Sequence, residues 1–156
     1  PYTRFSNINI PLFYKFKNLA LIKIGVCKNS RITKPQAFID TGAQYCMFNN
    51  AYASYLGISD FRNAPRDHQI NLTGIGGQKD ENIAYFHSVD LCVYLDQKHL
   101  DNKNAILVKD IEVAFLEKDF DIGGILGVYG FLDRFTFLTN IKDGYFEISP
   151  LFEADL

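Results

Sequence analysis

The sequence predicts an all-β fold, a closed barrel of short strands in a single lobe with one or two short helices. Fourteen Phe and nine Tyr, with no Trp, favour this fold class because aromatic rings pack well on half-buried pleated surfaces. Short apolar runs, several of them alternating in period two, are separated by turns rich in Gly, Pro, Asn and Asp. A length of 156 residues suits one domain that buries a hydrophobic core.

The individual elements follow from these runs. Asn49 and Asn50 are suited to cap a helix over residues 51–56, which Gly57 ends, and we expect a second short helix over residues 130–134. Residues 1–18 mix aromatic and polar side chains and indicate an extended arm ahead of the domain at residues 19–156. We expect strands at residues 19–26, 36–40, 70–73, 82–87, 89–95, 106–116, 135–138 and 145–148.

Charge and composition argue against several function classes. A net charge of -2 gives no basic field for a phosphate backbone, so nucleic acid is not an expected partner. No stretch approaches the roughly 18 apolar residues of a membrane span, so no membrane insertion is expected. Cys27, Cys46 and Cys92 lack metal-binding spacing and predict reduced thiols in the cytoplasm or another reducing compartment. The chain begins at Pro1 and not at Met, so an upstream targeting segment stays open.

The segment with the clearest chemical meaning is Asp40-Thr41-Gly42, which directly follows the apolar residues 37–39. A carboxylate there is costly to bury without hydrogen bonds, and Gly42 removes a side chain that would block a ligand or another backbone. These three residues alone are a weak signal, because an ordinary turn after a strand uses the same residue types. The nearest second acidic segment, at Asp121, lacks the Thr and reads as a turn before a strand.

Three further segments follow in an informative order. The apolar residues 46–48 and the helix at 51–56 come after Ala43, residues 72–77 (LTGIGG) form a glycine-rich hairpin tip, and residues 125–127 (ILG) precede residues 130–135 (GFLDRF). In this order and spacing, residues 19–148 resemble the single-lobed, retropepsin-like aspartic proteases. The length of the chain makes it more similar to a cellular or microbial relative than to a viral enzyme.

The resemblance implies an acid-protease-like barrel and a mechanism. Two copies of Asp40, one from each protomer of a homodimer, would share a proton and activate a water that attacks a peptide or protein substrate. Thr41, Gly42 and Ala43 would support the catalytic loop, and the arm at residues 1–18 would contact the partner. No metal or cofactor is required. Ala43, in place of the serine of two-lobed relatives, predicts an optimum in mildly acidic to near-neutral conditions.

Two more segments gain roles through the resemblance. A mobile flap would bind substrate as an added strand, although an ordinary surface hairpin has the same composition. Another segment would cradle the catalytic loop. The predicted flap consists of Gly74, Ile75, Gly76 and Gly77. The predicted support consists of Ile125, Leu126 and Gly127.

Some residues depart from the retroviral pattern. Gln44 stands where an acidic residue is common, and Val128-Tyr129 stands where a basic residue is common, which puts substrate contacts and one ion pair in doubt. Two other functions therefore stay open: a catalytically inactive peptide-binding or dimerisation module on the same fold, and a hydrolase with Cys46 as nucleophile, for which no local signature exists.

Overall fold

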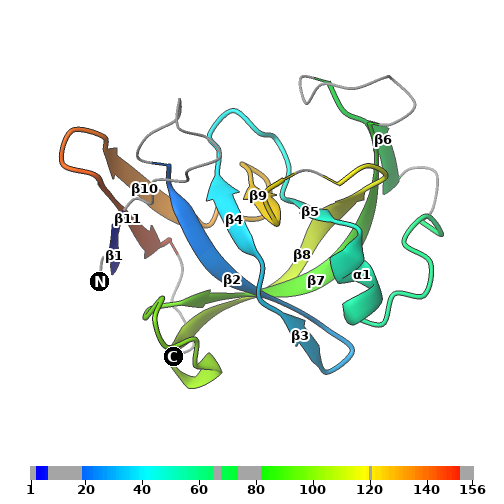
Figure 1. The fold of residues 1–156 in the computed structure, drawn as a ribbon, viewed down its shortest axis with the longest axis horizontal. Coiled ribbons are helices and arrows are strands. Elements are labelled where there is room, and N and C mark those ends of the chain that lie inside the picture. Colours follow the sequence, from blue (N-terminus) through cyan, green and yellow to red (C-terminus); the bar gives the residue numbers. More distant parts are fainter. Residues whose placement is uncertain (1–2, 7–18, 65–67, 74–81, 120, 152–156) are drawn as a thin grey trace.

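The computed structural model describes residues 3–6, 19–64, 68–73, 82–119 and 121–151. Most of these residues lie in one eight-stranded sheet with the order β3-β2-β4-β9-β5-β8-β7-β6. An additional pairing of β2 with β7 closes six of the strands into a ring (Figure 1). The predicted closed β barrel is thereby confirmed. The strands of this sheet are β2 (Leu21–Lys28), β3 (Arg31–Thr33), β4 (Gln36–Ile39), β5 (Met47–Asn49), β6 (Gln69–Asn71), β7 (Ile83–Tyr94), β8 (Ala105–Leu116) and β9 (Gly124–Leu126).

Strand direction within the barrel is mixed. β7 and β8 form a long antiparallel hairpin, and β2 pairs antiparallel with both β4 and β7. β9 runs parallel to β4 and antiparallel to β5, while β5 runs parallel to β8. β9 therefore lies between β4 and β5, which precede it by about eighty residues in sequence. A late segment of the chain is thus placed beside an early one.

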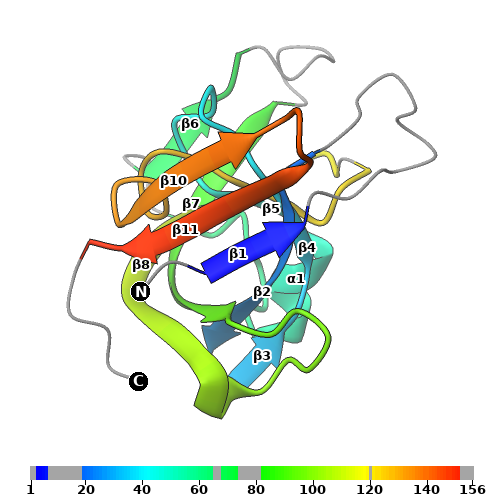
Figure 2. The same ribbon diagram turned by 90° about the vertical axis from the view of Figure 1, so that its left-hand side faces the viewer.

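A second, smaller sheet covers one side of the barrel (Figure 2). Its order is β1-β11-β10, all antiparallel, with β1 (Thr3–Ser6), β10 (Phe135–Asn140) and β11 (Tyr145–Pro150). Phe135, Phe146 and Ile148 carry their side chains into the main hydrophobic core together with residues of the barrel strands. Of the predicted arm, residues 3–6 form β1, and the other arm residues lie outside the described part of the chain.

The described residues contain one α-helix, α1 (Ala51–Tyr55), close to the predicted 51–56. Asn50 occupies the N-cap position but makes no capping bond, because its side chain donates instead to the carbonyls of Leu116 and Glu117 at 3.0 and 3.2 Å. Gly57 ends the helix with φ +77°, as its residue type predicts. No helix within the described ranges is long and apolar enough to cross a membrane.

The second predicted helix, over residues 130–134, is wrong. These residues form turns, and the N–H groups of Leu132 and Asp133 donate five residues back, to Gly127 and Val128, instead of making the four-residue spacing of a helix. Gly130 has φ +96°, a left-handed value that is incompatible with a continuing α-helix.

Candidate active site

Asp40 lies directly after β4, at the turn that leads out of the barrel. Its N–H donates to the carbonyl of Leu126 in β9 (3.0 Å), and its carbonyl accepts from the N–H of Ala43 (3.2 Å). Its Oδ1 accepts a hydrogen bond from the N–H of Gly42 (2.8 Å). A Cβ on Gly42 would lie 3.2 Å from that same oxygen, so the glycine lets the turn close around the carboxylate. The half-buried carboxylate is therefore held by the backbone of its own turn.

The residues after β9 support this turn from behind. The N–H groups of Val128 and Tyr129 donate to the carbonyls of Ala43 and Gln44, at 2.9 and 2.8 Å. A Cβ on Gly127 would lie only 2.7 Å from the carbonyl oxygen of Ala43, so only glycine allows this approach of two backbones. The structure thus brings the predicted supporting segment against the predicted catalytic loop. Backbone hydrogen bonds join them at the place where the retroviral pattern has an ion pair.

Thr41 and Gly42 are exposed at the outer side of the turn. The predicted role of Thr41 in supporting the catalytic loop stays a prediction.

A groove of about 610 Å³ opens in front of Asp40. Asp40, Gly42 and Ala43 line it together with Ile70 and Leu72 of the β6–β7 hairpin. Met47 and Ile125 also line the groove. The carboxylate therefore faces a space that is large enough for several side chains of a peptide.

The floor of this groove is a hydrophobic cluster distinct from the barrel interior. Its buried members are Met47, Ala84, Phe86, Ala114 and Leu116. Half-buried apolar residues of the catalytic loop and of β6, among them Ala43 and Ile70, pack against it. The outer surface of the β7–β8 hairpin thus supplies an apolar base on which an extended peptide can lie.

The β6–β7 hairpin rises beside the groove. Gln69 to Asn71 pair with Ile83 to Tyr85, and the N–H of Leu72 continues the ladder to the carbonyl of Asn82 at 2.9 Å. The predicted hairpin is present up to this point. The residues predicted for its flap, Gly74, Ile75, Gly76 and Gly77, lie outside the described residues.

Other reactive groups give no competing site within the described residues. Cys46 is fully buried, burial raises the pKa of its thiol to about 12, and its Sγ donates to the carbonyl of Tyr129 at 3.4 Å. Such a thiol is a poor nucleophile, which argues against the alternative of a Cys46 hydrolase. The described chain contains no group of three or more His, Cys, Asp or Glu side chains that could hold a metal ion.

Sequence reasoning did not identify Tyr45 as a groove residue. Its ring meets Phe86 edge-to-face with centroids 5.0 Å apart, and lies 5.7 Å from the ring of Tyr129. Tyr45 follows Asp40 by five residues, but both aromatic partners come from distant segments. Only the spacing from Asp40 could have marked it in advance.

Comparison with known proteins finds similarity in structure only. No family model matches the sequence, and no curated protein matches it. A retropepsin-like aspartic protease from Rickettsia conorii has a similar structure, with a TM-score of 0.57 and 19% identity over 95% of this chain and 91% of that one. The retroviral protease-like domain of Ddi1 from Leishmania major has a TM-score of 0.45 and 18% identity over 87% and 98% of the two chains. The chain has the single-lobed fold of a retropepsin-like aspartic protease domain.

Proposed function

We propose that this protein is an aspartic endopeptidase that hydrolyses peptide bonds with two Asp40 carboxylates, one from each protomer of a homodimer. The observation that carries the proposal is the Asp40 carboxylate, fixed by the N–H of Gly42 at the mouth of a groove of about 610 Å³. Because the fold is that of a retropepsin-like protease, this carboxylate is the group from which catalysis is expected.

The chemistry needs two carboxylates close together. Like-charge repulsion keeps one of them protonated, so the pair shares a proton. The ionised member takes a proton from water, which attacks the scissile carbonyl, and the protonated member hydrogen-bonds the carbonyl oxygen. No metal is needed for either step.

A second chain supplies the second carboxylate. Within one chain the nearest sequence candidate is Asp121, but it lies beside the opposite end of β4: a Cβ on Gly123 would be 2.9 Å from the carbonyl oxygen of Gln36, the first residue of that strand. Asp40 follows its last residue, and four strand residues span about 13 Å. That separation is too large for a shared proton, which favours a homodimer formed around the exposed Thr41 side of the turn.

The groove favours extended peptides with apolar residues near the cut. Met47, Ile70, Leu72 and Ile125 line it, so apolar substrate side chains find apolar contacts there, beside the polar Gln44, Asn71 and Thr73. A peptide in extended conformation matches the strand edge that the β6–β7 hairpin offers.

The decisive experiment replaces one carboxylate oxygen. The Asp40→Asn variant keeps the size and the hydrogen bond from Gly42 but removes the acid, so we expect it to dimerise and to lose cleavage of an unfolded protein such as denatured casein. Asp121→Asn is the matched control and should cleave like wild type. Equal cleavage by wild type and Asp40→Asn contradicts the proposal.

Sedimentation combined with a cleavage assay distinguishes the peptidase from the alternative, an inactive peptide-binding module. Cleavage that rises with the dimer fraction supports the shared active site. A wild-type dimer that binds a statine-type peptide analogue without cleaving any peptide would instead identify an inactive peptide-binding module.

A further inference from the structure

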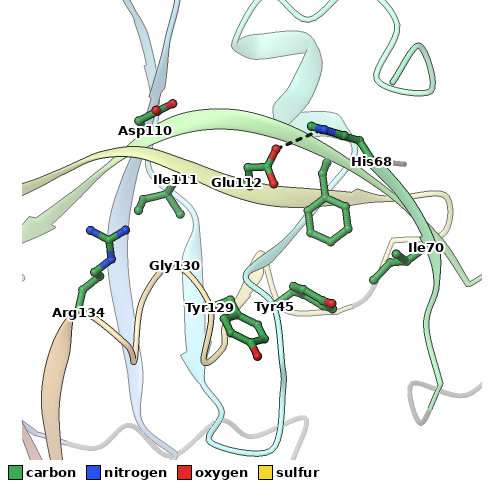
Figure 3. A pocket seen from close by; sticks show the side chains of 10 residues that line it. Tyr45, His68, Ile70, Asp110, Ile111, Glu112, Tyr129, Gly130 and Arg134 are labelled. Carbon is green, nitrogen blue, oxygen red and sulfur yellow. Dashed lines mark ion pairs between the residues drawn. The ribbon is translucent and has the colours of Figure 1, made fainter. Parts of the chain in front are cut away.

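A second cavity of about 460 Å³ lies beside the catalytic groove (Figure 3). Tyr45 and Ile70 line both cavities, so the groove in front of Asp40 passes into the second one across these two side chains. We call this second cavity the side pocket. A peptide bound over Asp40 could therefore place a more distant side chain in it without leaving the surface.

The side pocket has an aromatic base. Tyr45 packs edge-to-face on Phe86, and its ring centroid lies 5.7 Å from that of Tyr129. Tyr129 is 56% exposed. Ile111 adds an apolar side chain from β8. Exposed aromatic faces attract cations, because the ring carries negative charge density on its faces.

The opposite wall carries carboxylates. Asp110 and Glu112 both lie on β8 and both line the pocket, and Figure 3 shows Glu112 across the cavity from Tyr45 and Tyr129. The Glu112 side chain is 57% exposed, and its Oε1 lies 3.1 Å from Nδ1 of His68. A carboxylate has a second oxygen, so Glu112 retains acceptor capacity for a ligand.

Asp110 is fixed by its backbone. It has φ +56° at the position where the β7–β8 register shifts, a left-handed value that Asp tolerates better than most residues. Its N–H donates to Oδ1 of Asp90 at 2.8 Å, and its own Oδ1 accepts from the hydroxyl of Ser88. The bulge therefore places Asp110 at the pocket rim, with one carboxylate oxygen already hydrogen-bonded to Ser88.

The charges of the pocket leave it acidic. Arg134 also lines it, and its Nε lies 3.7 Å from Oδ1 of Asp133, a carboxylate outside the lining. Among the pocket's acidic and basic side chains, Asp110 and Glu112 contribute two carboxylates against the single guanidinium of Arg134, so negative charge is in excess.

We propose that the side pocket binds a lysine or arginine side chain of the substrate, distal to the scissile bond. The inference rests on the proposed peptidase function and adds its substrate class. The aliphatic stem would lie on Tyr45, and the cationic head between Tyr129 and Glu112. Side chains on one face of an extended peptide recur about every 6.8 Å, so the residue involved is one or more such repeats from the cut.

The test compares peptides that differ at one position. Wild-type protein is given a set of peptides with an established cut site. In each peptide, one position up to about four residues from the cut is Lys, Arg, Ala or Glu. We expect one position where Lys and Arg raise kcat/KM about tenfold over Ala, a size typical of an exposed ion pair combined with a cation–π contact. Glu112→Gln should reduce that preference through KM, with kcat unchanged.

Three further variants make the test sharper. Glu112→Lys should reverse the preference so that the Glu peptide becomes the better substrate. Asp101→Asn removes the same charge from the loop between β7 and β8 and should leave the preference unchanged. Asp110→Asn keeps a residue type that tolerates positive φ and should weaken the preference without loss of folding.

The outcomes separate this inference from the proposed function. Cleavage without any preference for Lys or Arg, or a preference that survives Glu112→Lys, overturns the inference and leaves the peptidase intact. If the protein cleaves nothing, binding of fluorescent Lys and Ala peptides to the Asp40→Asn variant tests the pocket directly. Equal affinity for both peptides overturns the inference there too.

Discussion

Replacing Gly127 with Ala measures how strongly the segment after β9 holds the catalytic turn. A Cβ at this position would lie 2.4 Å from the carbonyl oxygen of Tyr45 and 2.7 Å from that of Ala43, whereas ordinary contacts begin at 3.4 Å. The turn must therefore retreat by about 1 Å, the difference between 3.4 and 2.4 Å. Because both contacts are backbone atoms, no side-chain rotation relieves them.

The energetic cost follows from that displacement. Overpacking costs about 1–3 kcal/mol. Weakening the hydrogen bonds from Val128 to Ala43 and from Tyr129 to Gln44 adds about 1 kcal/mol each. We therefore expect Gly127→Ala to lower the melting temperature by about 10 °C in a domain of this size. A shift of about 1 Å at the carboxylate should lower kcat/KM by about 100-fold.

Thermal unfolding and cleavage of a fluorogenic peptide are the two assays, and Gly42→Ala is the comparison. Its Cβ would meet only Oδ1 of Asp40, at 3.2 Å, so we expect a melting temperature within about 2 °C of wild type but reduced activity. If Gly127→Ala melts with wild type and retains full kcat/KM, the backbone contact between the two segments does not position Asp40, and the reasoning is refuted.

Three further predictions concern groups outside the groove. Because burial raises the pKa of Cys46 to about 12, iodoacetamide near neutral pH should label it only after unfolding, and labelling in the native protein would contradict the packing. The Sγ atoms of Cys27 and Cys92 lie 3.4 Å apart on β2 and β7, so oxidised glutathione should convert them to a disulfide that raises the melting temperature by about 5–10 °C, an increase that Cys27→Ser abolishes. Hydrogen bonds from Arg62 lower the pKa of Glu117, so the pair stabilises the fold above the ordinary pKa of a glutamate, and this contribution is lost as pH falls through the lowered value. Arg62→Leu should lower the melting temperature by about 1–2 °C at neutral pH and leave it unchanged in strong acid, and an equal loss at both pH values would count against the pair.

The parts of the fold that depend on a few neighbouring residues could be predicted from the sequence. Gly57 ends α1 with φ +77°, and Gly144, with φ +71°, forms the turn between β10 and β11. The carboxylate turn at Asp40 is of the same kind, since its hydrogen bonds to Gly42 and Ala43 span two or three residues. Local residue types were sufficient in each case.

Elements fixed by distant partners were predicted less well. The two strands expected at 82–87 and 89–95 are one strand, because the interruption near Val89 is a register shift against β8 and not a chain break. Residues 29–35, for which the sequence analysis predicts no strand, contain β3, because Asn29 and Ser30 both adopt positive φ and reverse the chain within two residues. Only the partner strands show that these segments are paired.

The substrate surface is the least local feature of all. Asp110 and Glu112 look like the solvated face of a strand that alternates in period two, and Tyr129 looks like an ordinary exposed ring. Only the fold shows that they belong to one surface beside the groove, because Tyr45, five residues after Asp40, lines both cavities. The short chain length between Asp40 and Tyr45 ties the geometry of the acid to the geometry of the side pocket. In the proposed peptidase, the loop that carries Asp40 therefore also forms part of the surface that would bind the peptide.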